Sequence, residues 1–215
     1  MKFKSFALAS ALFATAFTVH AGEVYVGAGF PGLTLGYSHT LSPTVKLRGE
    51  YAGGLSLNKD GKTGGVNYNA KIKTNRVGAF ADWFPTSTGF HLTGGITASD
   101  IGGNFTARGG AGQTINNKPV DLTGKELSIS VTYPDVTPYI GMGWSSKPSN
   151  ATGWGFYGNI GLQIGKFKTN YTENGVIGSG GITQADVEVE VNKVRDAVNK
   201  LSVLPSVSLG LTYRF

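Results

Sequence analysis

The chain has 215 residues, of which 33 are glycine and none is cysteine, and its formal net charge is +6. The absence of cysteine excludes a disulfide scaffold, a thiolate zinc site and a cysteine nucleophile. The glycines follow no Gly-X-Y period, which excludes a collagen, and 3 Trp, 9 Tyr and 12 Phe are too many for a disordered chain. The length allows one or two domains, and the richness in glycine and aromatic residues is typical of β-barrels.

Residues 1–21 have the pattern of a secretory signal peptide. Lys2 and Lys4 precede an apolar run, and Val19-His20-Ala21 forms a small-residue cleavage site before Gly22. The alternative is a retained N-terminal anchor, but the apolar run is too short for a spanning helix. We therefore expect a cleaved signal peptide at 1–21 and a mature barrel at 22–215. No later apolar stretch is long enough for a transmembrane helix, so the mature chain can cross a membrane only as a closed barrel.

The mature sequence alternates between apolar and polar residues in segments of about the length that a tilted spanning strand needs. The fourth and sixth segments change parity near Asn75 and near Pro134 and Asp135, which indicates bulges or strand ends. After the first turn, short connections (41–44, 85–89, 146–153) alternate with long ones (53–67, 101–126, 172–202). This pattern predicts a single eight-stranded antiparallel up-and-down transmembrane β-barrel with periplasmic turns and extracellular loops. The strands are placed at about 23–30, 33–40, 45–52, 68–84, 90–100, 127–145, 154–171 and 203–215.

Two distributions indicate which face of each strand looks outward. Aromatic residues of the apolar face gather beside the short turns, as expected of a girdle at the periplasmic membrane interface. They are Tyr37, Trp83, Phe90, Trp144, Trp154, Phe156, Tyr213 and Phe215. The other face carries charges of both signs, which can pair inside a lumen: Glu23, Lys46, Arg48, Glu50, Arg76, Asp82 and Arg214. A secreted lipocalin-like barrel, with its apolar face inside, is the alternative that these charges disfavour.

Three segments of the sequence resemble a known family. The run Thr137-Pro-Tyr-Ile-Gly-Met-Gly-Trp144, then Trp154-Gly-Phe-Tyr-Gly, and the ending Pro205-Ser-Val-Ser-Leu-Gly-Leu-Thr-Tyr-Arg-Phe215 are similar to uncharacterised small outer-membrane β-barrels of Gram-negative bacteria. More distantly, the chain resembles the ornithine-uptake, carbapenem-associated porin type. The resemblance implies an outer-membrane location and passage of small cationic solutes. It also implies that Phe215 ends a signal read by the barrel assembly machinery.

One convincing helix is predicted, at about 184–201 in the last long loop. Val187, Val191 and Val194 begin an apolar stripe that Val198 and Leu201 continue. The barrel mouth, other loops or the outer leaflet could cover this stripe. A basic stretch from Lys59 through Lys62, Lys71 and Lys73 to Arg76 could meet lipopolysaccharide phosphates or could simply be solvated. The expected partners are the lipid bilayer, lipopolysaccharide and small polar solutes, and nucleic acid is not expected.

Little in the sequence indicates catalysis or a cofactor. Gly27-Ala-Gly29-Phe-Pro-Gly32 fits a dinucleotide motif, but Pro31 and a second strand follow it where a helix would be needed. His39 and His91 are the only histidines of the mature chain, too few for a metal site without converging carboxylates. Neither lies in the His-x-Ser spacing of membrane deacylases, so no catalytic, metal or cofactor-binding residue is predicted.

The charged lumen leaves the function open between classes. One hypothesis is a narrow pore for small polar or cationic solutes, with the inward glycines making room for a path. The alternative is a closed structural or adhesive barrel that acts through its extracellular loops. In that case the charges form a plug, and the glycines offset the bulk of Tyr25, Phe80, Tyr139 and Tyr157. A lipid-modifying enzyme is the third hypothesis. The pairs expected within the plug join Glu50 and Asp82 to Arg48 and Arg76.

Overall fold

The computed structural model describes residues 22–63, 66–86, 88–109, 112–145 and 152–215. The predicted signal peptide at 1–21 lies outside the described residues, as do parts of the turns predicted at 85–89 and 146–153. Within the described ranges, no helix is long and apolar enough to cross a membrane.

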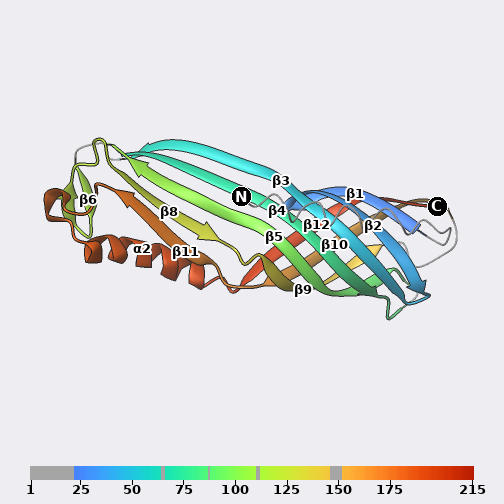
Figure 1. Ribbon diagram of the computed structural model, residues 1–215. Helices are drawn as coiled ribbons and strands as arrows, with labels where there is room; N and C mark the ends of the chain where they lie inside the picture. Colours follow the sequence, from blue (N-terminus) through green and yellow to red (C-terminus); the bar gives the residue numbers. More distant parts are fainter. Residues whose placement is uncertain (1–21, 64–65, 87, 110–111, 146–151) are drawn as a thin grey trace, which may run out of the picture.

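Eight strands form a closed antiparallel barrel, which confirms the predicted fold class (Figure 1). The ring closes because β12 pairs with β1 and because β5 pairs with β9. Both ends of the described chain meet at one rim, where the Phe215 N–H donates to the Gly22 carbonyl over 3.1 Å. In order around the barrel, the strands are β1 (Gly22–Phe30), β2 (Gly32–Ser42), β3 (Val45–Thr63), β4 (Val66–Trp83), β5 (Phe90–Arg108), β9 (Val136–Ser145), β10 (Gly153–Ile164) and β12 (Val203–Arg214).

Several strands are longer or more divided than the sequence predicted. The predicted long loop at 53–67 is largely strand, because β3 and β4 continue as a paired ribbon up to Thr63 and Val66. Prediction ended the third strand at its two glycines, but these form a bulge in which the register shifts between Gly53 and Leu55. Gly54 has a φ of 87°, which glycine adopts without strain. The bulge or strand end predicted near Asn75 in the fourth segment is not found in that strand: β4 keeps its register with β5 through Asn75, and the bulge lies opposite it in β3.

The sixth and seventh predicted segments are each divided in two. The segment predicted at 127–145 becomes β8 (Glu126–Thr132) and β9, with the break at the predicted Pro134 and Asp135. The segment predicted at 154–171 becomes β10 and β11 (Lys168–Asn174). In both cases the second piece belongs to a different structure from the first: β9 and β10 complete the barrel, whereas β8 and β11 add to strands that have already left it.

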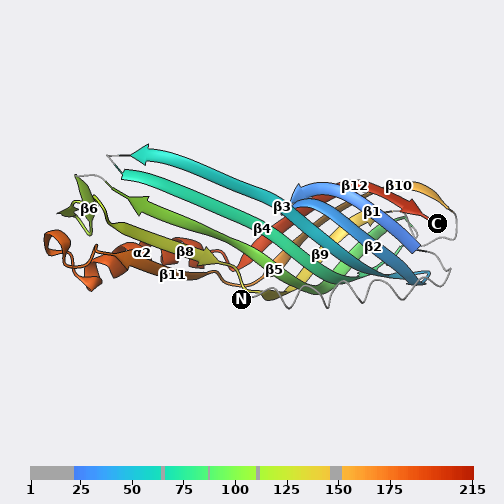
Figure 2. The ribbon, with the colours of Figure 1, turned by 45° about the horizontal axis from the view of Figure 1, so that its top comes forward.

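Beyond the barrel, on the side away from Gly22 and Phe215, β3, β4 and β5 continue as an open sheet, and β8 and β11 add to it (Figures 1 and 2). We call this part the extension. It also contains a small hairpin of β6 (Gln113–Ile115) and β7 (Lys118–Val120), the 3₁₀-helix η1 (Ser179–Gly181) and the helix α2 (Gln184–Asn199). The barrel wall is therefore tall on one side and short on the side of β1, β2, β10 and β12.

Helix α2 begins at Gln184, as predicted, and ends two residues before the predicted end. The Thr183 hydroxyl accepts from the Asp186 N–H, and the Asp186 carboxylate accepts from the Thr183 N–H, which forms a capping box. Val187 and Val191 are fully buried in the core of the extension. The remaining buried members of that core are Ile115, Val120, Leu122, Leu127, Val176 and Ile182. Of the three coverings left open by the sequence, the structure shows the other loops: the stripe packs on the hairpin and sheet of the extension.

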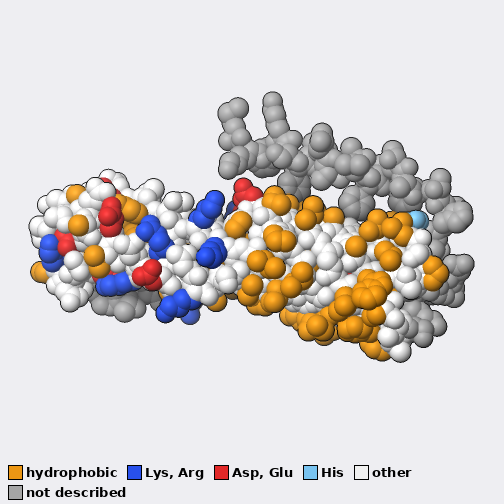
Figure 3. All heavy atoms as spheres, turned by 90° about the horizontal axis from the view of Figure 1, so that it is seen from below, with side chains coloured by type: hydrophobic (Ala, Val, Ile, Leu, Met, Phe, Trp, Pro, Cys, Tyr) orange, Lys and Arg blue, Asp and Glu red, His pale blue; other side chains and the backbone are white. Residues whose placement is uncertain are grey.

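The barrel exterior is an apolar belt. Outward side chains such as Val26, Leu35 and Leu209 are 54%, 62% and 69% exposed, which is the arrangement of a surface that faces lipid. Figure 3 shows hydrophobic side chains covering the barrel half of the molecule and charged side chains gathered on the extension. The belt therefore covers the barrel, and the charged side chains lie mainly on the extension.

Candidate functional site

The seven lumen charges predicted from the sequence all point into the barrel. Strand alternation places them there, because successive side chains of a strand point to opposite faces. Each of the seven residues is at most 8% exposed. They come from β1, β3, β4 and β12, and they form two groups at different depths. We call the two groups together the lumen network.

The central group is built around Arg48. Its guanidinium donates to Glu50 Oε2 over 2.7 Å and through Nε to Asp82 Oδ2 over 3.0 Å. Arg76 pairs with the other oxygen of Glu50 and donates to the Ser206 hydroxyl of β12 over 3.1 Å. The pairs expected of these four charges therefore include three that the structure forms, and the Arg76–Ser206 bond carries the network across the lumen.

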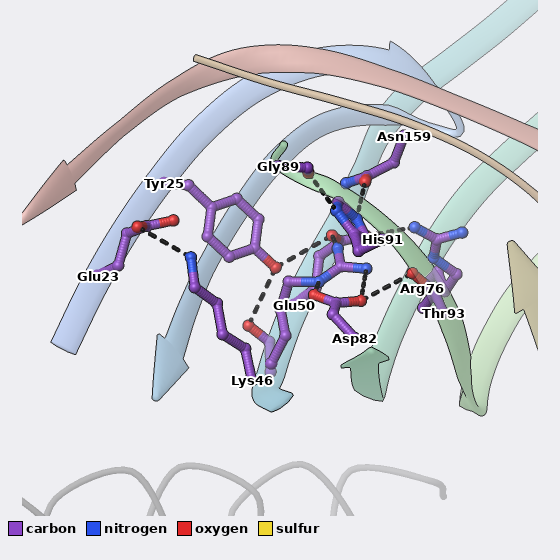
Figure 4. A network of polar contacts seen from close by, with 12 residues as sticks. Glu23, Tyr25, Lys46, Glu50, Arg76, Asp82, Gly89, His91, Thr93 and Asn159 are labelled. Carbon is purple, nitrogen blue, oxygen red and sulfur yellow. Dashed lines mark hydrogen bonds and ion pairs between the residues drawn. The ribbon is translucent and has the colours of Figure 1, made fainter. Parts of the chain in front are cut away.

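Uncharged side chains complete the central group. The Tyr25 hydroxyl donates to Glu50 Oε2 over 3.1 Å, and the Thr93 hydroxyl donates to Asp82 Oδ1 over 2.7 Å. Figure 4 shows these residues pointing toward one another from separate strands. Each buried carboxylate thus accepts several hydrogen bonds, which is the condition under which buried charges are tolerated.

The second group lies at the rim where the chain ends meet. Glu23 accepts from Arg214 over 2.7 Å and from Lys46 over 3.3 Å. Glu23 and Arg214 face each other directly in the β1–β12 register, so this group ties the first and last strands of the barrel to β3. It therefore helps to hold the closing seam.

Aromatic rings fill the space between the charges. Tyr25 and Tyr157 meet edge to face with centroids 5.1 Å apart, and Phe80 and Tyr139 do so at 4.8 Å. The Arg48 guanidinium lies 4.7 Å from the Phe80 centroid, within the range of a cation–π contact.

These rings lie over inward glycines. The sequence left open whether those glycines make room for a path or offset the bulk of the rings. A Cβ at Gly36 would lie 2.1 Å from the Tyr25 ring, and one at Gly161 would lie 2.1 Å from the Tyr139 hydroxyl. A Cβ at Gly78 would lie 2.2 Å from the ring of Phe80. These glycines therefore make room for the aromatic rings, which fill that space in the lumen.

A second polar cluster closes the lumen toward the extension, and sequence reasoning did not single it out. Gln163 Oε1 accepts from the hydroxyls of Thr97 and Ser99, each over 3.0 Å, and the Thr97 and Thr137 hydroxyls are 2.8 Å apart. The Tyr133 hydroxyl donates to the Gln163 carbonyl over 2.7 Å. The sequence did indicate that these polar residues point inward, because they share the parity of the lumen face. Uncharged side chains on that face are less conspicuous than charged ones.

The lumen retains one small described cavity between the two charged groups. Its volume is about 20 Å³, and its walls include Glu23, Lys46 and Asp82. A space of this size holds about one water molecule. His91 also lines it, is 2% exposed, and places Nε2 2.9 Å from Asn159 Oδ1. His91 thus takes a buried, hydrogen-bonded position in the lumen.

The other sequence-predicted residues lie on the outer surface. Trp83, Trp144, Trp154, Phe156 and Phe215 are 50–76% exposed, and Tyr37, Phe90 and Tyr213 are half-buried. Phe90 faces Trp144 across β5 and β9, and the rings of Trp154 and Tyr213 are in tilted contact with centroids 5.1 Å apart. All of them lie toward the rim where the chain ends meet. His39 is half-buried near the same rim.

Potential metal ligands do not gather in the structure. Within the described ranges, no group of three or more His, Asp or Glu side chains is arranged to hold a metal ion. The seven lumen charges pair with one another and leave the carboxylates occupied by cations of the chain itself.

Comparisons with known proteins identify solved structures with a similar fold. No protein-family model and no curated protein matches the chain. The crystal structure of CarO from Acinetobacter baumannii is similar to it with a TM-score of 0.56 and 22% identity, over 90% of this chain and 97% of CarO. The chain has the CarO fold. CarO2 from the same organism matches with a TM-score of 0.57 and 20% identity, over 92% of this chain and 100% of CarO2. These likenesses confirm the distant resemblance to the carbapenem-associated porin type at the level of architecture, and architecture alone does not assign a solute.

Proposed function

We propose that this protein is a closed outer-membrane β-barrel that anchors the extension at the cell surface, where the extension makes the protein's external contacts. The observation that carries the proposal is the filled lumen. Paired charges, aromatic rings over glycines and the Gln163 cluster occupy successive levels of the barrel interior. An eight-stranded barrel is about wide enough for its own side chains, and here those side chains interlock.

The extension supports the second half of the proposal. It has a hydrophobic core of its own around Val187 and Val191, so it is a packed structure and not a set of loops. On the face that continues the lumen, Leu57 and Phe105 are 61% and 46% exposed beside that core. Apolar side chains exposed to water next to a packed core are typical of surfaces that make contacts.

The narrow pore stays a prediction with less support. A path for cationic solutes would have to pass two guanidinium groups: Arg48, which pairs with Glu50 and Asp82, and Arg76, which reaches Ser206 on the opposite wall of the lumen. Displacing them would leave buried charges without partners, which is costly. The lipid-modifying enzyme gains no support from the contacts of His91, whose partners are Asn159 and the Gly89 carbonyl.

Liposome swelling tests the closed lumen. Liposomes that contain the refolded mature protein and are placed in glycine, ornithine or glucose should swell no faster than protein-free liposomes, while a general porin in parallel swells them. Swelling in ornithine at a rate proportional to the amount of protein would contradict the proposal and favour the pore.

The orientation has a separate test, because the chain has no cysteine of its own. Thr114 lies exposed in the hairpin of the extension, and Thr88 lies exposed in the short turn between β4 and β5. A membrane-impermeant maleimide should label Thr114→Cys in intact Gram-negative cells and Thr88→Cys only after the outer membrane is permeabilised. The opposite pattern would place the extension in the periplasm and defeat the proposal.

A further inference from the structure

A groove crosses the lipid-facing wall of the barrel on its short side. It has a volume of about 610 Å³ and is lined by outward side chains of four neighbouring strands: Phe30, Ile140, Met142, Ile160, Leu162 and Val207. Backbone at Gly141 and Gly161 also lines it. The volume of the groove is within the range of ligand pockets, and its walls are apolar, so it suits a hydrocarbon chain.

The groove lies in the half of the belt nearest the extension. Phe30 is the last residue of β1 and faces Val207, which in turn faces Ile160. In the proposed orientation this is the level of the outer leaflet. A chain that occupies the groove would therefore belong to a lipid whose head group lies at the outer surface.

Cations stand above the groove, where the belt ends. Strand β10 ends at Ile164, and the exposed Lys166 and Lys168 follow it directly. An extended chain rises about 3.3 Å per residue, which puts Lys166 about 13 Å beyond Leu162, at head-group height above the groove.

The basic band continues around the outer face of the extension. The strand register places Lys168 in one row with Thr132, Gly102 and Lys73. Three strand spacings separate the two lysines, or about 14 Å. Lys71 lies two residues further along β4 on the same face, and both β4 lysines are exposed.

Two exposed carboxylates, Asp100 and Asp135, lie at the same junction, so the four lysines leave a net charge of +2. Figure 3 shows Lys and Arg side chains gathered where the orange belt gives way to the extension. An apolar groove at outer-leaflet depth below a positive band fits a lipid with long acyl chains and phosphate groups on its head.

We propose that this surface binds lipid A, the phosphorylated acyl-chain anchor of lipopolysaccharide, with one acyl chain in the groove and a phosphate on Lys166 and Lys168. The inference goes beyond the closed-barrel function and rests only on its outer-membrane orientation. Lipid A is the occupant because both features, the acyl groove and the cationic band, lie on the outer-leaflet side, where lipopolysaccharide replaces glycerophospholipids. Membrane-surface lysines contribute about fivefold each to binding of anionic lipid, so removing two has a measurable effect.

Native mass spectrometry of the full mature protein in detergent, titrated with lipid A, tests the proposal. The wild type should bind one lipid A, at least about tenfold more tightly than phosphatidylglycerol. The variant Lys166→Gln/Lys168→Gln should bind lipid A about 25-fold more weakly. The charge-matched control Lys59→Gln/Lys193→Gln changes exposed lysines away from the groove and should bind like the wild type. Equal affinity of the two double variants, or equal binding of phosphatidylglycerol, would overturn the proposal.

A second pair of variants tests the groove itself and does not depend on charge. Met142→Trp fills the groove, whereas Leu35→Trp adds the same ring to the belt on β2, outside it. Met142→Trp should weaken lipid A binding and Leu35→Trp should not, with heat-modifiable gel mobility confirming that both are folded. The same affinity in both variants, or a protein dimer that only Met142→Trp dissociates, would overturn it. A chain labelled at Thr114→Cys on intact cells that fails to bind lipid A would defeat this inference alone.

Discussion

At the scale of single residues, Arg76 is the side chain that spans the lumen. It pairs with Glu50 on the neighbouring strand and donates to Ser206 on the opposite wall. Arg76→Ala leaves Glu50 with one guanidinium fewer in a buried site, so we expect the free energy of unfolding to fall by about 3 kcal/mol. Urea titration of the protein in lipid vesicles measures this change, and Arg76→Lys should lose less because it keeps a cation beside Glu50. An unchanged urea midpoint in Arg76→Ala would show that the network does not stabilise the barrel.

The glycines beneath the rings make a second prediction at the residue scale. Gly36→Ala places a Cβ where the Tyr25 ring lies, so the ring must move and its bond to Glu50 is strained or broken. Overpacking of this kind costs about 1–3 kcal/mol. Gly94→Ala is the matched control, because nothing lies within 4 Å of its added Cβ. The loss in free energy of unfolding caused by Gly36→Ala should be smaller in a Tyr25→Ala background. An equal loss in both backgrounds would show that the added Cβ does not act through the Tyr25 ring.

At the scale of elements, helix α2 depends on one carboxylate. Lys118 and Asn116, each bonded to Asp186 over 2.7–2.8 Å, and the Thr183 cap hold the pKa of Asp186 well below its usual value. A carboxyl with a lowered pKa in the folded state stabilises it above the unfolded pKa of about 3.9, and this contribution is lost as the pH falls further. Hydrogen exchange of α2, corrected for intrinsic rates, should therefore be steady from pH 7 to about pH 5 and accelerate below about pH 4. Asp186→Asn should weaken α2 at neutral pH and flatten this profile, and a profile like that of the wild type would contradict the assignment.

Elements also show where sequence reasoning succeeds and where it stops. The helix start, its buried Val187 and Val191, and the strand break at Pro134 and Asp135 could all be predicted, because each rests on local periodicity or on turn residues. The ribbon of β3 and β4 beyond Gly53 could not, since the two strands pair with each other there without the apolar and polar alternation from which strands were predicted. Two glycines in sequence looked like the start of a loop, and only the register shows that they form a bulge within one strand.

At the scale of the whole molecule, parity predicted which residues enter the lumen, and among the four central charges it also predicted pairs that form. Arg48 pairs with Glu50 on its own strand and with Asp82 on the adjacent strand. Contacts across the barrel, such as Arg76 with Ser206, depend on strand tilt and closure, which no local pattern carries. For the same reason the sequence could not decide whether the inward glycines leave a path or receive rings.

Single-channel recording of the refolded mature protein in planar bilayers tests whether the interlocked charges and rings close the lumen. We predict no discrete conductance steps for the wild type across ordinary salt and voltage, and a rise in conductance for Arg76→Ala, in which the bridge across the lumen is lost. Stable, cation-selective conductance steps in the wild type that Arg76→Ala leaves unchanged would contradict the closed lumen.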